Sequence, residues 1–283
     1  DWEAPHFNLA TDNWVVLSPQ GNIVGASGIW HREHVIMMVP VNVHPDYVGM
    51  GVGTALLRKA EERARQLMVE APEHARITMR SGTISTNQDA KQRLEREGFT
   101  LVRSIWKMET EMDEAPPVPI WPEGIAVRTF VRGQDERTVF EADEEAFQDH
   151  WGHVETPFDA WEHWMIKRKG FEPSLWFLAY DGNEVAGFSL CRYEQNNENS
   201  ESNGWVETLG VRRPWRHLGL GTALLYHSFG EFYRRGIRKV GLDVDSQNLT
   251  GAVRLYERVG MHAVRQYDSY EKELRSGVEL SKR

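Results

Sequence analysis

Apolar positions recur with two different spacings along this chain, and each spacing predicts one kind of element. Alternating apolar and polar residues are typical of strands, whereas a spacing of three to four residues is typical of amphipathic helices. In the second half, the predicted strands are 125–129, 175–180, 184–193, 205–211, 239–244 and 267–273. The predicted helices are 134–147, 159–169, 219–235 and 249–259.

The first half repeats most of this order. Its predicted strands are 14–17, 23–30, 34–43 and 76–80, and its predicted helices are 51–68 and 87–96. Strands alternating with helices favour an α/β fold with a mixed sheet in each half. No room remains at the start for an opening strand and two opening helices, so we expect the first unit to be truncated at its N-terminus.

Two blocks of sequence also recur in the same order. Residues 43–57 match residues 211–225, and residues 90–99 match residues 252–261. Ordered recurrence at this length indicates a duplicated domain.

A proline-rich segment separates the two repeats. Its prolines fix φ and remove backbone donors, which excludes a helix or a central strand and favours a semi-extended linker. We therefore predict an N-terminal domain at 1–112, a linker at 113–124 and a C-terminal domain at 125–283.

Composition and charge narrow the function classes. Hydrophobic residues make up 40% of the chain and charged residues 27%, which is ordinary for a globular protein. The net charge of −9 excludes a basic nucleic-acid footprint and weakly favours a cationic substrate such as an amine. No apolar run is long enough to span a membrane. The single cysteine, Cys191, cannot form an internal disulfide, which favours a cytoplasmic protein.

One strand-loop-helix segment carries the chemistry. After the strand 205–211, Gly219 and Gly221 let the backbone of the loop approach a ligand closely. The amides at the start of the next helix are free to bind phosphate, and Arg216 adds a charge, so we interpret the loop as a pyrophosphate cradle. Position 224 is Leu, which excludes a dinucleotide fingerprint, and no Gly-Lys-Ser/Thr is present. A plain loop-to-helix turn remains the alternative.

This loop identifies a family resemblance. Arg216-x-x-Gly219-x-Gly221 resembles the acyl-CoA pyrophosphate motif of the GCN5-related N-acetyltransferase (GNAT) superfamily. The segment 248–261, with a tyrosine before a turn, resembles the next conserved block of that family. The tandem arrangement, with the better-preserved unit second, is similar to that of mycothiol synthase and its relatives.

The resemblance implies acetyl-CoA as cofactor and assigns roles to named residues. The backbone of Leu209 and Val211 would take the pantetheine like an added strand. Glu207 would act as base, directly or through water, and Tyr256 would be the acid that protonates the thiolate. The remaining cofactor contacts would be Arg216, His217, Leu218, Gly219, Leu220, Gly221, Thr222 and Asn248. The alternatives are a solvated Glu207, a packed Tyr256 and an Asn248 that only caps its helix.

The first unit departs from the pattern. Val39, Val48 and Leu94 stand where the second unit has Glu207, Arg216 and Tyr256. The loop itself survives, so we predict a degenerate unit with a possible second CoA loop. That loop comprises Val43, Gly49, Gly51, Gly53 and Thr54.

The acceptor side is less specific. The resemblance places it at the two opening helices of the second unit, where Glu145, Asp149 and Trp151 could hold a cationic amine. A solvated acidic helix face is the alternative. His150 and His153 have no third ligand at a suitable spacing, so we expect no metal.

These observations predict an acyltransferase. The second unit would acetylate a primary amine of a small molecule by direct transfer, since Cys191 lies away from the site. A mycothiol-synthase-type activity, an aminoglycoside or antibiotic acetyltransferase, and a non-catalytic CoA-binding sensor remain open. Two fused units that cover each other make a monomer plausible.

Overall fold

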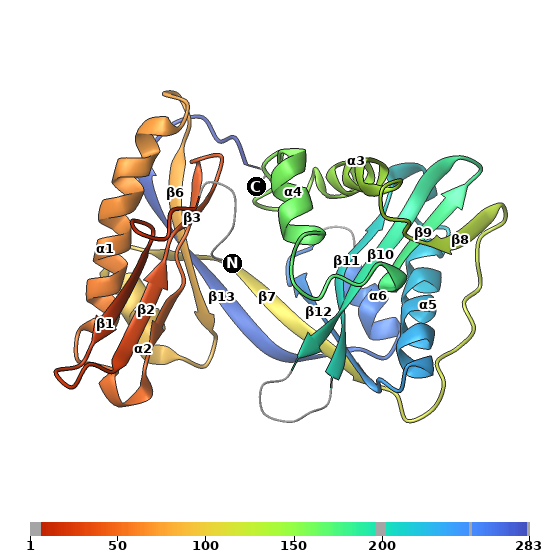
Figure 1. Cartoon of the computed structure of the whole chain (residues 1–283), viewed down its shortest axis with the longest axis horizontal. Helices are drawn as coiled ribbons and strands as arrows, with labels where there is room; N and C mark the ends of the chain where they lie inside the picture. The colour runs from red at the N-terminus through yellow and green to blue at the C-terminus, as the bar shows by residue number, and fades with distance from the viewer. Residues whose placement is uncertain (1–6, 196–201, 249–250, 282–283) are drawn as a thin grey trace. The chain divides into compact units, whose positions relative to one another are not determined.

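The computed structural model describes residues 7–195, 202–248 and 251–281, and it divides the chain into two compact units (Figure 1). Unit 1 comprises Asp1–Ile105 and Arg265–Arg283, and unit 2 comprises Trp106–Val264. These units do not end where the repeats end, because each unit takes a strand from the other half of the sequence.

Two long strands pass from one unit to the other. Strand β7 (Thr100–Glu111) begins in unit 1 and ends in unit 2, where Met108 is almost completely buried in the core. Strand β13 (His262–Arg275) begins in unit 2 and ends in unit 1, where it pairs with β6 (Ile77–Ile84). Our sequence prediction missed β7 altogether, and it placed only the middle of β13.

Unit 1 holds two small sheets, with strand orders β1-β2-β5 and β3-β4-β6-β13. Helix α1 packs on β2 and β5 through the apolar face of Leu56, Leu57 and Ala60. The remaining elements are β1 (Asn13–Leu17), β2 (Ile23–Gly28), β3 (Trp30–Arg32), β4 (Ile36–Met38), β5 (Val41–Val43), α1 (Val52–Leu67), α2 (Gln88–Arg96) and the 3₁₀ turns Pro45–Tyr47 and Met68–Glu70.

Unit 2 holds a mixed sheet with the strand order β8-β9-β10-β11-β12-β7. Its elements are β8 (Ile125–Thr129), α3 (Glu136–Phe147), α4 (Phe158–Met165), β9 (Trp176–Asp181), β10 (Glu184–Gln195), β11 (Ser202–Val211), α5 (Leu220–Arg234), β12 (Lys239–Asp245), α6 (Ala252–Arg258) and the 3₁₀ turns Pro173–Leu175 and Arg213–Trp215. Residues 113–124 contain no helix or strand.

Apolar cores cover both faces of this sheet. Phe188 and Leu190 of β10 pack with α3 and α4 on one face. Ser189 of β10 points to the other face, where its hydroxyl lies 2.8 Å from the Ser228 hydroxyl of α5. Cys191 shares that second face, and complete burial raises the pKa of its thiol to about 11. The thiol therefore stays protonated at neutral pH.

The duplication is visible in the register of the parallel strands. In unit 1, Ile36 of β4 is paired with Thr78 of β6. In unit 2, Gly204 of β11 is paired with Val240 of β12. These are the same positions of the two repeats. The α/β fold with a mixed sheet is thus confirmed.

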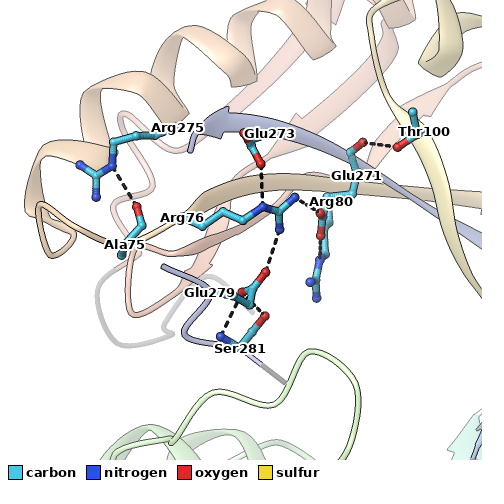
Figure 2. A network of polar contacts seen from close by, with 9 residues as sticks. All are labelled: Ala75, Arg76, Arg80, Thr100, Glu271, Glu273, Arg275, Glu279 and Ser281. Atoms are coloured by element: carbon cyan, nitrogen blue, oxygen red, sulfur yellow. Dashed lines mark hydrogen bonds and ion pairs between the residues drawn. The ribbon is translucent and has the colours of Figure 1, made fainter. Parts of the chain in front are cut away.

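An ion-pair network holds the C-terminal strand in unit 1 (Figure 2). Arg76 contacts three carboxylates, those of Glu271, Glu273 and Glu279, at 2.7–2.9 Å. Glu271 also accepts a hydrogen bond from Arg80, and both side chains are over 90% buried. Because β13 arrives from distant sequence, these charges help to select its partner and register.

We expect Glu271→Gln to destabilise the protein by about 3 kcal/mol, because two poorly exposed guanidinium groups lose their shared carboxylate. Glu273→Gln is the matched control. It contacts the same Arg76 from the same strand, but its side chain is 46% exposed, so its loss should cost less than about 1 kcal/mol. Urea unfolding of both variants checks the difference, and equal losses would contradict this role for Glu271.

Candidate active site

The loop between β11 and α5 has an unusual backbone. His217 and Gly219 both have positive φ, at 65° and 87°, and Gly219 caps α5 from the left-handed region. Unit 1 repeats this geometry at Gly49 and Gly51, with φ of 82° and 85°. Successive N–H groups in such a loop converge on one side and form an anion-binding concavity.

The same loop leaves its donors available. Among the described residues, the backbone N–H groups of 217–222 have no hydrogen-bond partner. A Cβ at Gly219 would meet no atom within 4 Å, whereas one at Gly221 would lie 3.2 Å from Leu255. The loop backbone is therefore exposed, and its free N–H groups can donate hydrogen bonds to a ligand. This arrangement fits the pyrophosphate of coenzyme A.

Arg216 does more than carry a charge at this loop. Its Nε donates to the carbonyl of Val211 at 3.0 Å, and its Nη2 donates to the carbonyl of Ala146 at 3.1 Å. The side chain thus fastens the loop to the end of β11 and to α3.

The open edge of β11 begins beside this loop. Within the part of the chain that the structure describes, β11 pairs with β12 at Gly204 and Trp205 alone. On its other side β11 has a bulge, because Leu190 faces Thr208 and Cys191 faces Val206, which leaves Glu207 as the extra residue. Bulges bend strands and are enriched next to active sites. Beyond Trp205, Leu209 and Val211 lie on a strand edge that β12 does not cover.

Glu207 is held by two cations. Its carboxylate accepts a short hydrogen bond from Arg192 and lies 3.4 Å from Arg168. Arg168 follows α4, so this contact joins the end of α4 to the bulge. As a base, Glu207 would have to take a proton while its carboxylate contacts two guanidinium groups.

Tyr256 lies on α6 in the core behind β11 and β12. Its side chain is only 8% exposed, and desolvation by burial raises the pKa of its phenol to about 12. Among the described residues its hydroxyl has no hydrogen-bond partner. A phenol in this setting stays protonated at neutral pH and has a proton to donate.

Helix α6 is shorter than the sequence predicted. It begins at Ala252 with Gly251 as its N-cap, so the interpretation of Asn248 as N-cap is wrong. Gly251 takes this place because its φ of 78° favours glycine. Leu249 and Thr250, which the predicted helix included, lie outside the described residues.

The acidic residues predicted on the acceptor side are paired with arginines of the loop between β11 and α5. Glu145 accepts a hydrogen bond from Arg212 at 2.6 Å, and Asp149 accepts a short one from Arg213. Trp151 is half-buried between α3 and α4. These contacts place the opening helices against the loop but neutralise the two charges.

Sequence reasoning missed a buried carboxyl group between α3 and α4. Asp143 accepts a hydrogen bond from the indole nitrogen of Trp161 at 2.8 Å, and burial raises the pKa of Asp143 to about 6. Its neighbours Glu144 and Glu145 made it look like part of a solvated acidic face. Only the packing of α4 on α3 distinguishes it.

Metal and membrane features can be stated for the described part of the chain. No group of three or more His, Cys, Asp or Glu side chains there could hold a metal ion. None of the helices described is long and apolar enough to cross a membrane.

Comparisons with known proteins agree with this geometry. A mycothiol acetyltransferase of Geodermatophilus obscurus is 32% identical over 266 residues, which cover 90% of this chain and 79% of that protein. A crystal structure of a GCN5-related N-acetyltransferase from Sphaerobacter thermophilus matches with a TM-score of 0.82 at 38% identity, covering 100% of this chain and 86% of that one.

A tandem GNAT protein from the clavulanic acid biosynthesis pathway shares the fold, with a TM-score of 0.71 at 18% identity and coverage of 94% and 84%. The model of the acetyltransferase (GNAT) family matches residues 1–99 and 137–261, one segment in each repeat. The chain therefore belongs to the GNAT family of acetyltransferases, and it is an acyltransferase with two tandem GNAT repeats.

Proposed function

We propose that unit 2 transfers an acetyl group from acetyl-CoA to a primary amine of a small molecule, without a covalent enzyme intermediate. The observation that carries this proposal is the parting of β11 from β12 directly before a loop of free N–H groups. The site thus offers an extended acyl-CoA an open strand edge and, after the turn 212–216, a group of free N–H groups.

The donor would be held mainly by backbone. The N–H groups of 217–222 would bind its pyrophosphate, and the open edge at Leu209 and Val211 would pair with its pantetheine. When bound, acetyl-CoA supplies a thioester whose acyl carbon accepts the amine. Arg216 keeps the loop in place through Val211 and Ala146.

Proton transfer would involve Tyr256, because a burial-stabilised phenol can protonate a leaving thiolate near neutral pH. Cys191 supports direct transfer, since its fully buried thiol with a raised pKa is a poor nucleophile.

Unit 1 would be a structural partner that lacks the proposed catalytic side chains. Val39 and Leu94 replace Glu207 and Tyr256, although the loop geometry at Gly49 and Gly51 is kept. The guanidinium of Arg93 packs directly against Gly53 of α1. A Cβ atom at position 53 would lie only 2.6 Å from Nη1 of Arg93.

The names of the relatives favour one acceptor class for the first test. Several similar proteins are called mycothiol acetyltransferase. The amine acceptor of those enzymes should therefore be tested first, and aminoglycosides and other antibiotics afterwards. The test is release of free thiol from acetyl-CoA with an amine panel. Thiol release with one amine supports the enzyme, whereas acetyl-CoA binding without release from any amine would favour the sensor alternative.

We expect Tyr256→Phe to lower kcat by about 10²–10⁴-fold while acetyl-CoA affinity and fold are kept, because only the hydroxyl is lost. The measurement is kcat and acetyl-CoA affinity on the amine that the panel identifies. Tyr226→Phe, a half-buried tyrosine of α5, controls for general effects of the substitution. An unchanged kcat, with chemistry rate-limiting, would remove Tyr256 from the mechanism.

We expect Gly219→Ala to weaken acetyl-CoA binding by about tenfold, because a left-handed backbone costs an ordinary residue about 1–2 kcal/mol and relaxing it misaligns the donors. Gly51→Ala is the matched control, with nearly the same φ and the same open space around its Cβ. Calorimetry and turnover of both variants test the loop. If Gly51→Ala impairs turnover and Gly219→Ala does not, the assignment of the active unit is wrong.

A further inference from the structure

A second carboxylate stands where β11 and β12 part. Trp205 and Gly241 form the last pair of the two strands. Glu207 and Asp243 each lie two residues further along, one on each side of the opening. The family resemblance assigns Glu207 as a base, whereas nothing in the sequence marks Asp243.

Asp243 faces the acceptor side of the sheet. Its strand neighbours Leu242 and Val244 are buried in the core with α5 and α6, so the alternation of β12 turns Asp243 to the opposite face. That face carries Trp205, whose ring contacts the position of Gly241 and lies under the charges of Lys107 and Arg192.

The other charges on this face are paired. Glu207 has Arg192 and Arg168, and Glu194 lies 3.4 Å from Lys107. Among the described residues, Asp243 has no hydrogen-bond or ion-pair partner. It is exposed, so solvent and an incoming ligand can reach it. Asp243 is therefore the carboxylate of this set that remains available to a new cation.

Its surroundings also make it a better proton acceptor than an ordinary aspartate. Desolvation by the surrounding protein raises the pKa of Asp243, and the charge of Lys107 opposes this shift. The negative charges of Glu207 and Glu194 raise the pKa further, and Arg192 lowers it. A base with a raised pKa holds a proton more readily.

We propose that Asp243 binds the ammonium group of the acceptor and takes its proton, while Glu207 keeps Arg168 and Arg192 in position. This inference rests on the proposed function. The ammonium gives one proton to the Asp243 carboxylate, and the neutral nitrogen forms a bond to the acyl carbon as the carbon–sulfur bond breaks. The thiolate takes a proton from Tyr256 or water. The nitrogen of the new amide loses its second proton, which restores the Tyr256 phenol or the water, and Asp243 returns its proton to solvent.

Unit 1 provides an internal comparison. The shared register of the two repeats places Ser81 of β6 where unit 2 has Asp243, and Ser81 is buried. Val39 already replaces Glu207 there. The unit without the acid also lacks this carboxylate, which is expected if the two act in one reaction.

The experiment compares Asp243→Asn, Asp243→Glu and the control Glu194→Gln in the full chain. Glu194→Gln removes a neighbouring negative charge whose partner Lys107 retains Glu109 at 3.2 Å. We expect Asp243→Asn to lower kcat/KM for the amine at least 100-fold, and to weaken calorimetric binding of the amine in the presence of CoA at least tenfold. Affinity for acetyl-CoA alone should stay within twofold, Asp243→Glu should recover part of the activity, and Glu194→Gln should stay within threefold.

The pH profile gives an independent readout. In the wild type kcat/KM should rise with pH as Asp243 ionises, and Asp243→Asn should lose this acid limb. A variant Asp243→Asn with unchanged kcat/KM and an intact acid limb would overturn the inference while leaving the acetyltransferase in place. Failure of the wild type to release thiol with every amine would instead refute the proposed function, and this inference with it.

Discussion

The early end of pairing between β11 and β12 is the constraint on which the site depends. Two residue pairs hold the strands together, and the bulge at Glu207 then bends β11. An unpaired strand edge must satisfy its N–H and C=O groups with water or a ligand. After the short turn 212–216, the loop 217–222 adds free N–H groups at the start of α5, so the unpaired backbone groups of strand edge and helix start lie in one segment of the chain.

The two repeats show that backbone geometry and chemistry are maintained by different residues. The register of the parallel strands is the same in both repeats. The loops also share their positive φ values, and a glycine at 51 or 219 caps the helix that follows. The repeats differ in single side chains, since Leu94 and Val39 stand where unit 2 has Tyr256 and Glu207, and these replacements leave the fold intact. A degenerate unit can therefore remain well folded, and it still supplies and receives a strand in the exchanged sheets.

Charge pairing decides which acidic residues can act. Glu145 and Asp149 neutralise the arginines 212 and 213, and Glu207 is held by two further arginines. A net negative composition thus gives little information on where a cation binds. What matters is which charged side chain has no ion-pair partner among the described residues. Where β11 and β12 separate, that side chain is the carboxylate of Asp243.

The sequence by itself determined the duplication, the α/β class, most elements and the family, because these depend on local periodicity and on glycines with special backbone angles. It missed β7, the exchange of strands, the bulge and the different surroundings of Asp143 and Asp243. Pairing partners and burial are properties of residues far apart in sequence, and identical runs of residues can be solvated or buried. Only the tertiary structure settles which side of a strand faces the opening, and so which carboxylate is left without a partner.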